Sequence, residues 1–341
     1  MIKKVAIVIL NWNGKSYLEK FLPSICSSNY SNLEIVVGDN GSTDDSVRFL
    51  AHNYPQIKQI KTGVNLGYAA GYNYVLNRVD ADYFILLNSD VEVSRDWIKP
   101  VIKMMESDPA IAAVQPKILS YRQPEEFEHA GAAGGYIDKF GYPFCAGRIL
   151  DSTETDHGQY DVSREIFWAT GAAFFIRRDA WQEMHGLDND FFAHMEEIDL
   201  CWRLKAAGYK IWYCAQSTVY HVGGGTLNKE NPYKTYLNFR NSLYMLQKNL
   251  SLISALFVIC LRLWLDLLAL IRFLYEGKRK DALAVNKAHI SFFRNFRKTA
   301  NKRKKQIKNY KISCVYNGSI VWDYFARGIK KYSKLKQEKF L

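Results

Sequence analysis

The sequence predicts an α/β fold, a doubly wound and mostly parallel sheet flanked by helices, followed by a C-terminal helical appendage. Over residues 1–90, short apolar runs of β-branched character alternate with segments of helical spacing, and polar motifs stand where the runs end. After residue 233 the spacing becomes helical throughout. We therefore expect an α/β domain at residues 1–232 and a helical, amphipathic and basic region at residues 233–341.

The individual elements follow from the same patterns. Residues 5–10 form a continuous apolar run, as in a strand buried on both faces of a parallel sheet. Residues 121–163 contain many glycines, and we expect a loop that shapes a substrate pocket. Further strands are expected at 33–37, 57–61, 83–87, 112–119, 167–176, 211–213 and 218–220, and helices at 15–27, 44–53, from 65 onward, 95–107, 179–184 and 197–208.

Composition limits the classes of protein that need be considered. The chain has 341 residues, is 48% hydrophobic and carries a net charge of +12. Twelve lysines and arginines against one acid, Asp281, gather in residues 278–308, which indicates an anionic partner surface. The six cysteines form no CxxC pair and are typical of reduced thiols in a cytoplasmic protein. The first apolar run is too short for a signal peptide and leads into polar residues 11–14.

Residues 250–275 are strongly apolar but are interrupted by Arg262, Asp266 and Arg272. Three charges disfavour a membrane-spanning helix. We expect an amphipathic helix that lies in the interface of an anionic membrane, beside the basic tract. Two alternatives stay open: a core helix with a solvated basic tail, and nucleic-acid binding through phenylalanines interleaved with Arg294 and Arg297. Of the two anionic partners, we favour the membrane over nucleic acid.

Two acidic motifs indicate chemistry. Glu196, Glu197 and Asp199 crowd into four positions, and mutual repulsion can raise the pKa of one carboxylate into the range of a general base. Upstream, Asp90 follows an apolar run within an Asn-Ser-Asp motif and offers the oxygen ligands that Mg²⁺ or Mn²⁺ prefers. His221 precedes glycines 223–225. These glycines would allow a flexible lid to move His221 to the metal as a further ligand.

Two further segments indicate nucleotide binding. Asp39 ends a predicted strand before a turn rich in glycine, serine and asparagine, where a carboxylate can accept hydrogen bonds from a base or a ribose. Residues 65–73 open a helix with glycines at positions where backbone must approach a neighbour closely. No Gly-Lys-Ser/Thr follows, so this segment is not a P-loop.

Taken in order, these motifs resemble the family 2 inverting glycosyltransferases with a GT-A fold, and most of all the rhamnosyltransferase-type branch. The resemblance covers roughly residues 1–230 and includes Gly171-Ala172 and the pattern Glu196-Glu197-x-Asp199-x-x-x-Arg203. Two positions depart from the family pattern. Glu197 stands where members commonly have Asp, and Asn88 stands at the first position of the Asp-x-Asp metal motif.

The resemblance implies a nucleoside-diphosphate-sugar donor, dTDP-rhamnose or a UDP-sugar, and a divalent cation, Mg²⁺ or Mn²⁺. Asp90 and His221 would hold the metal on the diphosphate. Glu197 would deprotonate the acceptor hydroxyl, with Glu196 as the second candidate, while Asp199 and Arg203 would pair along the helix. The residues expected to bind the donor are Asn11, Asn13, Asp39, Asn65, Gly67, Asn73, Asn88, Ser89 and Asp90.

The implied acceptor is a saccharide or lipid-linked saccharide in cell-surface polysaccharide assembly, and the implied location is the inner face of the cell membrane. Two other classes of function remain as alternatives. A sugar nucleotidyltransferase usually has a Gly-rich, basic loop after its first strand, which residues 11–15 do not match. The second alternative is a non-catalytic module that binds a nucleotide or nucleic acid.

Overall fold

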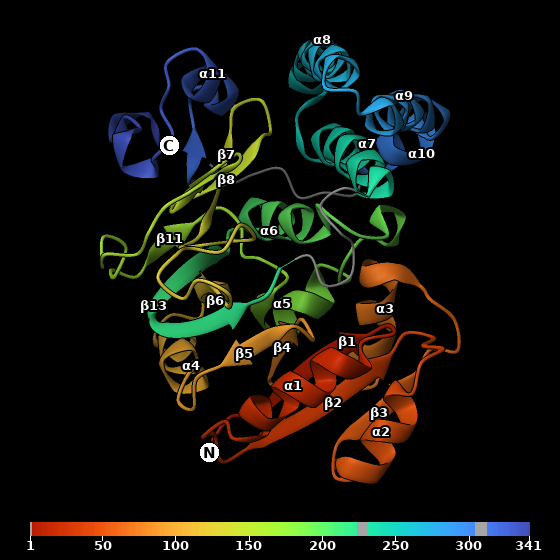
Figure 1. Ribbon diagram of the computed structural model, residues 1–341. Helices are drawn as coiled ribbons and strands as arrows, with labels where there is room; N and C mark the ends of the chain where they lie inside the picture. Colours follow the sequence, from red (N-terminus) through yellow and green to blue (C-terminus); the bar gives the residue numbers. More distant parts are fainter. Residues whose placement is uncertain (1, 224–230, 304–311) are drawn as a thin grey trace.

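Two sheets organise the molecule in the computed structural model, which describes residues 2–223, 231–303 and 312–341 (Figure 1). The large sheet contains nine strands within these ranges. From one edge to the other its order is β3 (Lys58–Lys61), β2 (Leu33–Asp39), β1 (Val5–Asn11), β4 (Tyr83–Leu87), β12 (Ala173–Arg177), β6 (Ile111–Ser120), β13 (Lys210–His221) and β11 (Arg164–Ile166), and β5 (Val91–Val93) pairs with β13.

Helices cover both faces of the large sheet, as predicted. Val5, Ile7 and Ile9 of β1 join a core with α1 (Lys15–Cys26), α2 (Ser46–Asn53) and α4 (Ile98–Ser107). Ala6 and Val8 point to the opposite core, which α3 (Gly67–Leu76), α5 (Arg178–Glu183) and α6 (Glu196–Ala206) help to form. The continuous apolar run of β1 follows from this burial on both sides, because alternate side chains of a strand point to opposite faces.

The parallel strands place the polar motifs at one edge. β1 pairs in parallel with β2 and β4, so that Asn11 lies beside Asp39 where both strands end. β12 is antiparallel to both of its neighbours, β4 and β6. The two short strands expected at 211–213 and 218–220 are one long strand, β13, with an irregularity in its pairing between Cys214 and Thr218.

The expectation of a loop at residues 121–163 is wrong in part. This segment supplies most of a second sheet, whose order is β10 (Ser152–Thr153), β9 (Arg148–Ile149), β8 (Pro143–Cys145), β7 (Gly135–Asp138) and β14 (Val315–Tyr316). β14 comes from the C-terminal part of the chain and pairs in parallel with β7. The aromatic ring of Tyr136 packs against Tyr332 and Phe340, which gives this sheet an aromatic core. The division of the chain at residue 232 stays a prediction.

Four helices form a bundle above the large sheet: α7 (Pro232–Asn249), α8 (Leu252–Tyr275), α9 (Arg279–Arg294) and α10 (Phe296–Arg303) (Figure 1). A short helix, α11 (Ile320–Phe325), follows near the C-terminus. Residues 304–308 of the predicted basic tract lie outside the described residues. In the ranges that the structure describes, α8 is the one helix long and apolar enough to cross a membrane by length and composition.

Two of the three charges of α8 face the protein, whereas Arg272 is exposed and pairs with Glu276. Arg262 and Asp266 are buried, and Arg262 donates a hydrogen bond to Ser242 Oγ over 3.0 Å. On the opposite side, Ile253, Phe257 and Trp264 are 82%, 68% and 70% exposed. Arg262 and Asp266 thus lie on the packed side of α8 and large apolar side chains on the other, and an amphipathic helix at a membrane interface stays a prediction.

Candidate active site

Asn11 and Asp39 offer two unpaired acceptors at the edge of the sheet. Asn11 Nδ2 donates to Ser42 Oγ over 3.2 Å, and Ser42 N donates to Asp39 Oδ2 over 3.3 Å. The remaining oxygens, Asn11 Oδ1 and Asp39 Oδ1, are buried and have no hydrogen-bond partner among the described residues. Leaving a buried acceptor unpaired costs about 1–3 kcal/mol. These atoms are therefore suited to accept hydrogen bonds from a ligand.

The other asparagines predicted to bind donor have bonds within the protein. Asn13 Oδ1 accepts from Thr43 N over 2.7 Å, which ties the loop after β1 to the loop after β2. Asn65 Oδ1 accepts from Gly67 N over 2.8 Å. Asn73 binds both the N–H and the carbonyl of Leu187, over 3.0 and 2.7 Å. These contacts shape the loops around the site, and donor binding by these three residues stays a prediction.

Gly67 permits a close approach within the same region. Its φ is +77°, and a Cβ atom there would lie 2.5 Å from the ring of Phe192. For both reasons, a residue with a side chain would fit at position 67 only if the surrounding atoms shifted. The glycine expected to approach a ligand thus approaches the loop that precedes α6.

The structure brings Asp90 and His221 together. β5 pairs antiparallel with β13, which places His221 opposite Val91 and beside Asp90. His221 Nε2 lies 3.1 Å from Asp90 Oδ1 and 3.4 Å from Asn88 Nδ2. Two ligands at about 2.1 Å from one cation lie about 3 Å apart, so this pair fits a divalent metal. The metal itself stays a prediction, and for Ser89 the described contacts establish no role in the site.

A residue that the sequence did not reveal, Glu128, lies behind His221. Its Oε2 is 3.2 Å from His221 Nδ1, and both side chains are buried. Burial would lower the pKa of His221, but the flanking carboxylates of Asp90 and Glu128 outweigh it and raise this pKa to about 10. Burial would raise the pKa of Glu128, but its close contact with the ring of His221 lowers it to about 2. The two carboxylates therefore favour positive charge on the ring of His221.

This geometry is also the one that supports metal-bound histidines, in which a carboxylate holds the ring nitrogen that faces away from the metal. Gly223 makes room for it, because a Cβ atom there would lie 2.6 Å from Glu128 Oε1. Gly224 and Gly225 of the predicted lid lie outside the described residues. No three His, Cys, Asp or Glu side chains form a complete metal site in residues 2–223, 231–303 and 312–341. Asp90 and His221 would thus leave positions for phosphate oxygens and water.

Glu196 and Glu197 stand in the first turn of α6 with unusual pKa values. Burial raises the pKa of both, and for Glu196 the charge of Glu197 raises it further. One oxygen of each, Oε2, is buried without a hydrogen-bond partner in the described part of the chain. Glu196 is 3% exposed, whereas Glu197 is half-buried. Of the two, Glu197 is the better placed to meet a substrate, and a raised pKa suits a general base.

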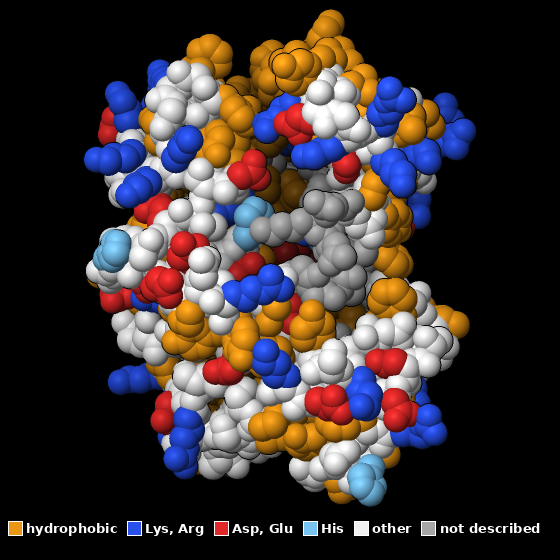
Figure 2. Space-filling view, viewed as in Figure 1, with side chains coloured by type: hydrophobic (Ala, Val, Ile, Leu, Met, Phe, Trp, Pro, Cys, Tyr) orange, Lys and Arg blue, Asp and Glu red, His pale blue; other side chains and the backbone are white. Residues whose placement is uncertain are grey.

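Gly171 and Ala172 connect the glutamates to the metal-site turn. The backbone of Gly171 hydrogen-bonds the carboxylate of Glu197, and Ala172 O accepts from Asn88 N over 3.0 Å. Space is tight, because a Cβ atom on Gly171 would lie 2.4 Å from the hydroxyl of Tyr68. The face shown in Figure 2 is hollowed below the helical bundle, and acidic side chains lie inside the hollow. The arrangement joins a candidate base to a candidate cation site through one short segment.

Comparison with known proteins identifies relatives of the chain. The model of glycosyl transferase family 2 matches residues 6–182. The N-acetylglucosaminyl-diphospho-decaprenol L-rhamnosyltransferase of Mycobacterium tuberculosis is 26% identical over 239 residues, which cover 65% of this chain and 76% of that protein. The rhamnosyltransferase WbbL of Escherichia coli is 24% identical over 222 residues, or 61% of this chain and 80% of that protein.

Solved structures share the fold. GalNAc-T7 with UDP, GalNAc and Mn²⁺ aligns with a TM-score of 0.56 at 15% identity and covers 72% of this chain and 48% of that chain. The mannosyltransferase PcManGT of Pyrobaculum calidifontis, in complex with GDP-Man and Mn²⁺, aligns with a TM-score of 0.52 at 14% identity over 89% and 85% of the two chains. The fold class predicted from the sequence, a GT-A glycosyltransferase fold, is confirmed.

Proposed function

The chain belongs to glycosyl transferase family 2, and from this premise we propose that it is a metal-dependent, inverting enzyme that uses a nucleoside-diphosphate-sugar. The observation that carries the proposal is the pair Glu196 and Glu197, whose pKa values are raised and whose Oε2 atoms are buried and unpaired within the described residues. A buried carboxyl with no partner destabilises the protein. A substrate hydroxyl would supply the missing hydrogen bond.

The proposed donor site lies at the carboxyl ends of β1, β2 and β4, where ligands bind in open α/β sheets. The unpaired oxygens of Asn11 and Asp39 would accept hydrogen bonds from the base and the ribose. Asp90 and His221 would hold Mg²⁺ or Mn²⁺ at the diphosphate. When bound, such a cation supplies electrostatic stabilisation of the charge that develops on the leaving diphosphate.

In the proposed step, Glu197 accepts the proton of the acceptor hydroxyl as that oxygen bonds to the anomeric carbon. The bond from this carbon to the diphosphate breaks, and the electron pair leaves with the nucleoside diphosphate. One displacement of this kind inverts the anomeric configuration. Glu196 is more deeply buried than Glu197 and is the second candidate for the base.

For the substrates we propose dTDP-rhamnose or a UDP-sugar as donor and a saccharide or lipid-linked saccharide as acceptor. The relatives in M. tuberculosis and E. coli are named as rhamnosyltransferases, and the first name includes a decaprenol-linked substrate. We further propose that the enzyme associates with the inner face of the cell membrane. Its exposed apolar side on α8 lies at the top of Figure 2, where hydrophobic side chains gather and basic side chains flank them.

A donor screen tests the proposed function. Purified protein with Mn²⁺ is incubated with each common UDP-, dTDP- and GDP-sugar, and release of nucleoside diphosphate is measured with and without EDTA. We expect EDTA-sensitive release from one donor, by transfer to water where acceptor is lacking. Pyrophosphate release from a nucleoside triphosphate and a sugar phosphate would instead indicate a nucleotidyltransferase. Absence of both release and calorimetric donor binding would refute the proposal.

A further inference from the structure

The segment that leads into α6 has a strained backbone. Phe192, His194 and Met195 have positive φ angles of 64°, 69° and 72°, although none is a glycine. Phe192 is the centre of a tight γ-turn, with ψ of −62° and a hydrogen bond of 2.8 Å from Ala193 N to Phe191 O. Such conformations persist only where the surroundings impose them, and they cluster at functional sites. Here they stand directly before Glu196.

Asn241 of α7 imposes much of this conformation. It is fully buried, and its Nδ2 lies 2.9, 2.8 and 2.8 Å from the carbonyl oxygens of Phe191, Ala193 and His194. Arg240 adds a hydrogen bond to Phe191 O over 3.0 Å. The remaining carbonyl, Phe192 O, accepts from Tyr68 N over 2.7 Å. One amide of the C-terminal bundle thus lies within hydrogen-bond distance of three of the four carbonyl oxygens of residues 191–194.

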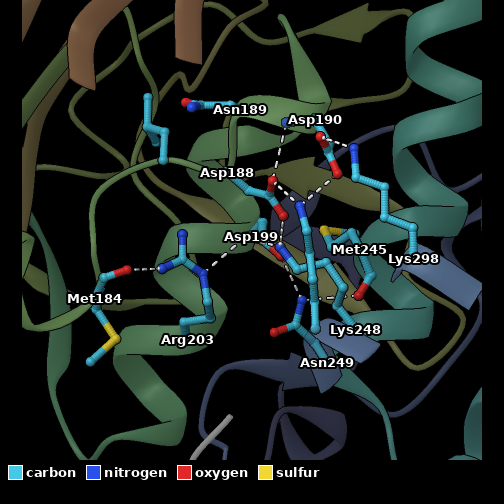
Figure 3. Close-up of polar contacts among 12 residues, drawn as sticks. Met184, Asp188, Asn189, Asp190, Asp199, Arg203, Met245, Lys248, Asn249 and Lys298 are labelled. Atoms are coloured by element: carbon cyan, nitrogen blue, oxygen red, sulfur yellow. Dashed lines mark hydrogen bonds and ion pairs between the residues drawn. The ribbon is translucent and has the colours of Figure 1, made fainter. Parts of the chain in front are cut away.

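A second contact from α7 holds the body of α6. Figure 3 shows Lys248 between Asp188 and Asp199, with Arg203 on the other side of Asp199. Lys248 Nζ lies 2.6 Å from Asp188 Oδ2 and 2.9 Å from Asp199 Oδ2. Arg203 Nε is 2.9 Å from the same oxygen of Asp199, which confirms the predicted pair along the helix. These ions are almost wholly buried, so a removed partner would leave an uncompensated charge.

We propose that Asn241 is a positioning residue for catalysis, which holds the loop at 191–194 so that the carboxyl of Glu197 faces the acceptor. Lys248 anchors the helix that follows. α7 is therefore part of the active-site framework, in addition to carrying the bundle of α8, α9 and α10. This inference rests on the proposed function, because it assigns a purpose to a loop that carries the proposed base.

Asn241→Leu tests the inference, because leucine has the same branched side-chain skeleton and donates no hydrogen bond. Gln247→Leu is the matched control. Gln247 is also a buried amide of α7, but it donates to Phe296 O in α10, over 3.1 Å, and lies away from the loop. Asn241→Ser is a milder variant that retains one donor, for use if the leucine variant does not fold. Each protein is studied as the full chain.

Two measurements decide the outcome. Hydrogen exchange followed by mass spectrometry reports on amides at 192–200 without any need for activity, and kcat for donor turnover is compared with the Kd for UDP or dTDP in Mn²⁺. We expect exchange in this segment to rise at least tenfold and kcat to fall about 10²-fold, with Kd within threefold of wild type. The control should change neither exchange at 192–200 nor kcat.

Unchanged exchange and unchanged kcat in Asn241→Leu, or equal losses in Gln247→Leu, would overturn the inference. Loss of donor binding together with kcat would also overturn it, since the residue would then act on the whole fold. If the wild-type protein turned over no donor, the proposed function would fail separately. The exchange measurement would still decide whether Asn241 holds the loop.

Discussion

Glu128 gives the sharpest test of the metal site, because no sequence motif marks it. Replacement of Glu128 by Gln keeps the shape of the side chain and removes the charge that lies 3.2 Å from His221 Nδ1. Residues that hold a metal-bound histidine in this way typically account for 10- to 100-fold in metal affinity. Since both side chains are buried, solvent does not screen the lost interaction. We expect Mn²⁺ binding to weaken by about 1.4–2.7 kcal/mol.

The assay is titration of Mn²⁺ in the presence of UDP or dTDP, with free Mn²⁺ read by electron paramagnetic resonance. Glu125→Gln is the matched control, since Glu125 belongs to the same segment and is exposed. His221→Ala should lose more affinity than Glu128→Gln. A Glu128→Gln protein that bound Mn²⁺ as tightly as wild type, while His221→Ala did not, would refute the role assigned to Glu128.

Two further predictions concern stability and membrane binding. Burial raises the pKa of Asp188 and Asp199, but Lys248 and its neighbouring cations outweigh burial and lower both pKa values, so the stabilising effect of the two carboxylates is present above about pH 4 and is lost as pH falls through the lowered pKa values. Lys248→Met should therefore reduce the free energy of unfolding by about 3 kcal/mol at pH 7 and by progressively less on acidification. A loss of stability in urea unfolding that grew toward pH 3.5 would contradict this. The double variant Phe257→Ser, Trp264→Ser should reduce co-sedimentation with phosphatidylglycerol vesicles at least tenfold. Val162→Ser, at a similarly exposed apolar residue outside α8, should leave co-sedimentation unchanged. Equal sedimentation of the wild type and both variants would show that α8 does not contact the membrane.

The large sheet was predictable because its strands carry strong local signals. β1 and β4 are continuous apolar runs that end at polar motifs, and parallel pairing brings those ends together. The second sheet had no such signal. β9 and β10 have two residues each, and β14 is separated from its partner β7 by most of the C-terminal half of the chain. Strands of this length show no periodicity that a sequence reveals.

The site divides in the same way. Asp39, Asp90, Glu197 and His221 stand in motifs, and the structure places Asp90 and His221 in contact. Glu128 contacts His221, which lies 93 positions away in the sequence, and Asn241 contacts a loop about 50 positions away. No motif in the sequence around either residue marks it. Charges within an apolar helix did carry information, because Arg262 and Asp266 mark the side of α8 that packs on the protein.

The measurement that tests the central proposal most directly compares Glu197→Gln with Glu196→Gln. Both variants remove a titratable carboxyl group from the first turn of α6 and retain the shape of the side chain. If Glu197 is the base, Glu197→Gln lowers kcat about 10²–10⁴-fold and leaves the Kd for the nucleoside diphosphate unchanged. This loss of kcat should be larger than the loss in Glu196→Gln. Wild-type turnover in Glu197→Gln, or a loss of nucleotide binding equal to its loss of kcat, would contradict the assignment of Glu197 as the base.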